Sequence, residues 1–172
     1  MRPEVTMSEI APTRRSVLMF ASGAFVASFF TGAHAALAQD AKPIKTLQAQ
    51  EAFDAAQSGE IILVDIRTPE EWRETRVGEG AIGLDMRTEE FVNSLVTLRK
   101  ANPDTPIALI CRTGARSAYV TAALAGQGFP GLMDVPEGMV GGRNGQGWLK
   151  RGLPTYEGTT NNIDARRNAI LP

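Results

Sequence analysis

The chain has very little of two residue types on which many enzyme active sites depend. Its 172 residues include one cysteine, Cys111, and one histidine, His34. A single cysteine cannot form a disulfide within the chain, so it is either a small buried apolar side chain or a reactive thiol. If His34 is lost with the N-terminus, no histidine remains. That would exclude Cys-His dyads, Ser-His-Asp triads and metal sites with histidine ligands.

Residues 1–38 have the pattern of a cleaved export signal. Arg14 and Arg15 precede a short, weakly apolar run, and two small-residue cleavage patterns follow this run. The cleavage patterns are Ala33-His34-Ala35 and Ala36-Leu37-Ala38. The adjacent arginines indicate the bacterial twin-arginine route, although Val17 and Met19 stand where that pattern prefers Phe and Lys. An ordinary Sec signal is the alternative.

Because the apolar run is shorter than the about 20 residues that a membrane span needs, we expect no stable membrane association after cleavage. We expect an exported, periplasmic protein. Residues 39–172 carry 15 basic and 17 acidic side chains, a net charge of −2, which gives no reason to expect a nucleic-acid partner. No motif indicates a cofactor, and we expect no metal ion because either cleavage removes the histidine.

Apolar periodicity predicts strands that alternate with helices. Strands are expected at 61–66, 81–86, 106–110 and 132–135, and helices at 46–57, from 68, at 88–100 and at 116–127. This alternation indicates an α/β fold, with a central parallel sheet and helices on both faces. We assign one domain to 39–158 and a polar, poorly ordered tail to 159–172. The glycine-rich stretch 138–147 is expected to be a flexible connection leading to Trp148 and Leu149 in the core.

Cys111 directly follows the strand expected at 106–110 and opens the sequence CRTGARS. The carboxyl ends of parallel strands form the functional crevice of such sheets. Gly114 permits a tight turn, and the backbone N–H groups of a loop that leads into a helix form an anion-binding concavity. These groups, with Arg112 and Arg116 if they approach, would stabilise a thiolate and attract an anionic substrate. The alternative is a structural cysteine with solvated arginines.

Three motifs resemble the rhodanese-like family of single-domain sulfurtransferases. They are VDIRTPEEW at 64–72, CRTGARS at 111–117 and GMVGGRNGQGWLKRGLP at 138–154. The resemblance spans 44–156 and implies sulfur transfer through a persulfide on Cys111. The donor would be a small anion such as thiosulfate, and the acceptor would be cyanide, a thiol or a protein. The substrate-binding residues would be Arg112, Thr113, Gly114, Ala115 and Arg116.

The same resemblance implies that Asp65 and Arg67 support the loop, with a surface ion pair as the alternative. Trp72 and Met139 would line the mouth of the pocket, with core packing as the alternative for Trp72. The sequence departs from the family pattern in two places. The stretch VGEGAI at 77–82 lacks the His and Pro that the family often has there, and the glycine-rich stretch lengthens the C-terminal motif.

Two other functions remain open from the sequence. A phosphatase or arsenate reductase with a related Cys loop needs an arginine at the sixth position after the cysteine. Ser117 occupies that position and the arginine is Arg116, so the smaller loop favours sulfur over phosphate. A sulfur carrier or binding module with little turnover would keep Cys111 as well. The sequence does not separate such a carrier from an enzyme.

Overall fold

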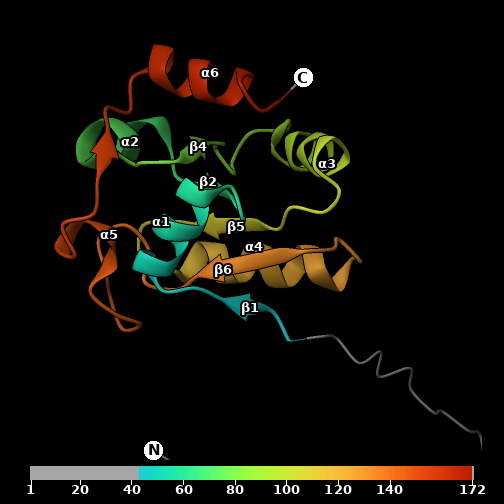
Figure 1. Cartoon of the computed structure of the whole chain (residues 1–172), viewed down its shortest axis with the longest axis horizontal. Coiled ribbons are helices and arrows are strands. Elements are labelled where there is room, and N and C mark those ends of the chain that lie inside the picture. Colours follow the sequence, from blue (N-terminus) through green and yellow to red (C-terminus); the bar gives the residue numbers. More distant parts are fainter. Residues whose placement is uncertain (1–42, 172) are drawn as a thin grey trace, which may run out of the picture. The chain divides into compact units, whose positions relative to one another are not determined.

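The predicted strands form a parallel sheet in the structure, a computed structural model that describes residues 43–171 (Figure 1). Its strands are β1 Lys45–Thr46, β2 Ile62–Asp65, β4 Ala81–Gly83, β5 Ile107–Ile110 and β6 Leu132–Val135. They lie in the order β1-β6-β5-β2-β4, and every neighbouring pair is parallel. The export signal expected at 1–38 lies outside the described residues.

Helices cover both faces of this sheet, as the sequence predicted. They are α1 Ala49–Ser58, α2 Pro69–Thr75, α3 Phe91–Ala101, α4 Ala115–Gly126, α5 Gly147–Lys150 and α6 Thr160–Asn168. Ala52 of α1 belongs to the core on one face, whereas Leu95 of α3 and Leu124 of α4 belong to the core on the other. In β2, Leu63 faces the first core and Val64 the second, which explains why the strand is apolar up to Asp65 at its end.

Local sequence signals place the helix ends that matter for the site. The Thr68 side chain accepts a hydrogen bond from the Glu71 N–H, and the Glu71 carboxylate accepts one from the Thr68 N–H. This capping box, together with Pro69 at the first helical position, starts α2 where the sequence predicted. α1 begins three residues later than predicted, because Lys45 and Thr46 pair with β6 as an edge strand.

The glycine-rich stretch 138–147 is not the flexible connection that we expected. The Met139 N–H donates to the Cys111 carbonyl at 2.8 Å, and the Val140 N–H donates to the Arg112 carbonyl at 2.9 Å. Glycine is needed for this close approach, since a Cβ on Gly138 would lie 2.6 Å from the Arg112 carbonyl oxygen. Trp148 is fully buried, as predicted. Glycine richness therefore reflects tight packing against the cysteine loop.

The tail expected to be poorly ordered forms α6 instead. Thr159 caps this helix, because its side chain accepts a hydrogen bond from the Asn162 N–H at 3.3 Å. The buried Ile163 anchors it above the edge strand β4, and Arg166 pairs with Glu79 at 2.8 Å. Figure 1 shows α6 next to α2 and β4. A small antiparallel ribbon of β3 Val77–Gly78 and β7 Thr155–Tyr156 leads into it.

Within residues 43–171, no helix has the length and apolar character that crossing a membrane requires.

Candidate active site

Cys111 stands between the end of β5 and the start of α4, as the sequence predicted. The loop turns at Gly114, whose φ of 89° lies in the left-handed region. A Cβ at this position would also collide with the carbonyl oxygen of Pro136. The Ser117 hydroxyl donates to the Gly114 carbonyl at 3.1 Å, which ties the turn to the first turn of α4. The turn therefore accepts glycine alone.

The sulfur of Cys111 faces backbone N–H groups at the N-terminus of α4. Its Sγ accepts a hydrogen bond from the Gly114 N–H at 3.2 Å, and the residue is only 1% exposed. Within the described part of the chain, the backbone N–H groups of Thr113, Ala115 and Arg116 donate to no acceptor. Free N–H groups and the helix dipole both favour negative charge at this point. This arrangement can stabilise an anionic sulfur.

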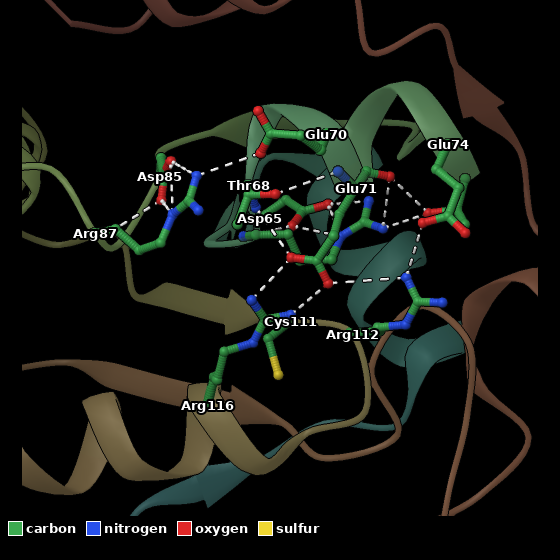
Figure 2. A network of polar contacts seen from close by, with 12 residues as sticks. Asp65, Thr68, Glu70, Glu71, Glu74, Asp85, Arg87, Cys111, Arg112 and Arg116 are labelled. Carbon is green, nitrogen blue, oxygen red and sulfur yellow. Dashed lines mark hydrogen bonds and ion pairs between the residues drawn. The ribbon is translucent and has the colours of Figure 1, made fainter.

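The two arginines of the loop bind carboxylates of α2 (Figure 2). Arg116 forms a bidentate pair with Glu71, with Nη1–Oε2 and Nη2–Oε1 distances of 2.8 and 2.6 Å. Arg112 Nη1 lies 3.2 Å from Glu74 Oε2 and 3.9 Å from Glu71 Oε1. A carboxylate therefore already binds each of the two arginines that the sequence predicts as substrate-binding residues. Their contact with a substrate stays a prediction.

The Arg116–Glu71 pair changes the ionisation of both groups. Burial by itself would raise the pKa of Glu71, but hydrogen bonds from Arg116 and Thr68 outweigh burial and lower it. The same carboxylate raises the pKa of Arg116, and Cys111 contributes a smaller effect in the same direction. Glu71 is therefore ionised at neutral pH, and Arg116 lies close enough to Cys111 for their charges to interact.

Asp65 and Arg67 form a fully buried pair, so the alternative of a surface ion pair is wrong. Arg67 Nε lies 2.9 Å from Asp65 Oδ1, and Nη2 lies 2.7 Å from Oδ2. The same guanidinium donates to the Arg76 carbonyl at 2.6 Å and to the Thr75 hydroxyl. The pair thus fixes the C-terminal end of α2 to β2, and it acts on the cysteine loop through Glu71 and Glu74, the α2 residues that bind the loop arginines.

Sequence reasoning missed two glutamates that hold the site. Glu71 lies in the first turn of α2, and its T-x-x-E spacing from Thr68 is the sequence signal of a capping box that could have found it. The fully buried Glu137 accepts a hydrogen bond from the Gly147 N–H at 2.9 Å and pairs with Arg151. The hydrogen bond from Arg151 lowers the pKa of Glu137. This pair closes the glycine-rich segment that packs on the cysteine loop.

Two further predictions concerned the mouth of the pocket. Met139 is fully buried in the core, so it does not line a mouth. Trp72 is also core, and it borders a cavity of about 470 Å³ between α2, β4, α3 and α6. No residue of the cysteine loop lines this cavity.

Comparison with known proteins identifies the family. Residues 48–144 match the family model of the rhodanese-like domain, and the chain therefore belongs to the rhodanese-like family. It is 30% identical over 101 residues to a sulfurtransferase of Allochromatium vinosum, a match that covers 58% of this chain and 81% of that protein. It is also 30% identical over 126 residues to the probable adenylyltransferase/sulfurtransferase MoeZ of Mycobacterium tuberculosis. That match covers 73% of this chain and 30% of MoeZ.

The fold is also that of a solved structure. The polysulfide-sulfur transferase homodimer of Wolinella succinogenes matches with a TM-score of 0.50 and 24% identity, over 66% of this chain and 78% of that one. This likeness shows a common fold. The family and the names of the relatives in sequence together support a role in sulfur transfer.

Proposed function

We propose that this protein is a sulfurtransferase that moves sulfane sulfur through a persulfide on Cys111. The observation that carries the proposal is the position of Cys111 Sγ, which accepts the Gly114 N–H at the N-terminus of α4. Backbone donors and a helix dipole can hold an anionic sulfur without a histidine, and residues 43–171 contain none. The chain also belongs to a family with relatives named as sulfurtransferases.

In the first half-reaction the Cys111 thiolate attacks the outer sulfur of a donor such as thiosulfate. A bond forms between Sγ and the outer sulfur, the S–S bond of the donor breaks, and sulfite leaves with the electron pair. The thiolate and the resulting persulfide each carry one negative charge. The same N–H donors therefore serve both states, and no proton has to move.

In the second half-reaction an acceptor takes the outer sulfur. Cyanide attacks that atom, thiocyanate leaves, and the electron pair of the broken S–S bond returns to Sγ as a thiolate. A thiolate acceptor attacks the same outer sulfur and becomes a persulfide itself, while Sγ again leaves as a thiolate with the electron pair of the broken S–S bond. Neither step needs an oxidant, a metal or a general base on the protein.

The test is a cyanide–thiosulfate assay of the protein and of its Cys111→Ala variant, together with intact-mass measurement after treatment with thiosulfate alone. We expect thiocyanate formation and a Cys111 adduct one sulfur atom heavier, and we expect the variant to lose both. Full activity in Cys111→Ala would contradict the mechanism. An adduct without turnover would identify a sulfur carrier, and neither adduct nor turnover would exclude both sulfur functions.

A further inference from the structure

The charges next to Cys111 are balanced rather than positive. The loop supplies Arg112 and Arg116, and α2 supplies Glu74 and Glu71 opposite them (Figure 2). Each guanidinium therefore has a carboxylate partner within 3.2 Å. A donor that approaches the sulfur meets two ion pairs instead of two free cations. The electrostatic free energy of that approach therefore depends on the charge of the donor.

Glu71 is the more strongly held of the two carboxylates. Its side chain is 15% exposed and that of Arg116 is 34% exposed, whereas the Glu74 side chain is 63% exposed. Two parallel N–H···O bonds are among the strongest polar contacts in proteins, and a pair withdrawn from solvent is weakly screened by salt. A dianion that sought Arg116 would have to break this pair or accept repulsion from Glu71.

Glu71 also cannot turn away without other losses. One of its oxygens accepts the Thr68 N–H at 3.2 Å, so its withdrawal would break one of the two hydrogen bonds of the capping box. The helix is itself fastened to β2 by the buried Asp65–Arg67 pair. The negative charge beside the cysteine loop is thus a fixed part of the fold.

We propose that Glu71 is a specificity-determining residue, which makes the Cys111 site favour sulfane donors of low negative charge over dianions. The inference rests on the proposed sulfur transfer and narrows its donor. The favoured class comprises monoanionic thiosulfonates and alkyl persulfides. Thiosulfate, a dianion, is disfavoured by the carboxylate, and Glu74 adds a weaker effect through Arg112.

Two donors of nearly equal shape separate charge from chemistry. Thiosulfate and methanethiosulfonate both offer a terminal sulfur on an SO₂ group, but the first carries O⁻ where the second carries a methyl group. The Cys111 thiolate takes the terminal sulfur from either, and sulfite or methanesulfinate leaves with the electron pair. The reacting bond is the same and the donor charge differs by one.

The experiment measures single-turnover persulfide formation on Cys111 by intact mass, with both donors, in the unmodified protein and in Glu71→Gln. Interaction energy between charges is proportional to donor charge, so the rate gain for the dianion should be the square of that for the monoanion. We expect about tenfold for thiosulfate and about threefold for methanethiosulfonate.

The matched control is Glu70→Gln. Glu70 precedes Glu71 in the same helical turn, is 68% exposed, and pairs with Arg73 and Arg87 rather than with the loop. This variant removes the same charge from the same helix end, so we expect the ratio of the two donor rates to stay unchanged. In Glu71→Gln the side-chain amide oxygen can still accept the Thr68 N–H, and the unfolding midpoint verifies that the fold is kept.

The outcomes separate this inference from the proposed function. No adduct with either donor in the unmodified protein would refute sulfur transfer, and the inference with it. Adducts with both donors but an unchanged donor ratio in Glu71→Gln would refute only the role of Glu71, as would a ratio that moves equally in Glu70→Gln. If Glu71→Gln fails to fold, Glu74→Gln decides, since a smaller shift of the same sign is expected there.

Discussion

The cysteine loop is held differently on its two sides. Towards the glycine-rich stretch 138–147 it is held by backbone hydrogen bonds and by glycines that leave no room for a Cβ. Towards α2 it is held by ion pairs of side chains that are partly exposed. The contacts with the glycine-rich stretch fix the backbone conformation of the loop, and the ion pairs with α2 set the charge near Cys111. Geometry and electrostatics of the site are therefore separable by mutation.

Gly114→Ala should have the largest effect on persulfide formation, because it disrupts the backbone contacts of the loop with the glycine-rich stretch. A Cβ would collide with the Pro136 carbonyl, and the φ of 89° is strained for alanine. We expect persulfide formation to fall at least about 100-fold and stability to fall by about 3 kcal/mol. Single-turnover mass measurement and denaturant unfolding would check this.

Gly126→Ala is the control for that variant. A Cβ there has no neighbour within 4 Å, and Gly126 is the last residue of α4. Stability should stay the same or rise slightly, with unchanged activity. Equal losses in the two variants would show that close approach at Gly114 is not what constrains the loop.

Asp65→Asn should have the next largest effect, because it leaves Arg67 buried without its carboxylate. Breaking a buried pair in this way costs about 3–5 kcal/mol. We also expect the ratio of the two donor rates to move towards that of Glu71→Gln, since α2 would no longer hold Glu71 in place. Unfolding curves and the two-donor rates measure both effects.

The chain contains its own control for this variant. Asp85 and Arg87 repeat the Asp-x-Arg arrangement with an Nη2–Oδ2 distance of 2.8 Å, but the Arg87 side chain is 59% exposed. Asp85→Asn should cost far less, because Arg87 can turn to water. A loss as large as that of Asp65→Asn would mean that burial is not the source of the difference.

Lowering the pH should have the smallest effect of these changes. It should act only through the ion pair between Glu71 of α2 and Arg116 of the loop. The pKa of Glu71 is lowered in the folded protein, so its pair contributes stability above the ordinary value of 4.5 and loses it as pH falls through the folded pKa. The donor ratio of the unmodified protein should then approach that of Glu71→Gln. Because both donors react at the same sulfur, a change in the reactivity of Cys111 itself leaves the ratio unchanged. A ratio that already reaches the Glu71→Gln value above pH 4.5 would contradict this, because the pKa of Glu71 is lowered from that value.

Most of the fold could be predicted because its signals are local. Apolar periodicity predicted the strands at 61–66 and 106–110, and it predicted a helix from residue 68, where Thr68 and Pro69 start α2. The position of Cys111 before Gly114 and a helix indicated the loop. Each of these conclusions depends on residues that are neighbours in sequence, where periodicity and capping rules apply.

The rest could not be predicted because it depends on contacts between distant residues. Arg116 and Glu71 are 45 positions apart, and no periodicity pairs them. Glycine in 138–147 is compatible with either mobility or close packing. The stretch packs closely because its backbone N–H groups donate to the carbonyls of Cys111 and Arg112, which are distant in sequence. α6 has the single buried apolar residue Ile163, too weak a signal to predict a helix.

The buried guanidinium of Arg67 has a consequence for the dynamics of α2. α2 has only seven residues, too few to persist by itself, yet one guanidinium ties the Arg76 carbonyl at its C-terminal end to a carboxylate at the end of β2. The helix therefore cannot fray independently of the sheet and belongs to the same cooperative unit. We expect its hydrogen-bonded amide hydrogens to exchange as slowly as those of the central strands, and we expect the carboxylate that faces Arg116 to keep its place for as long as the sheet stays folded.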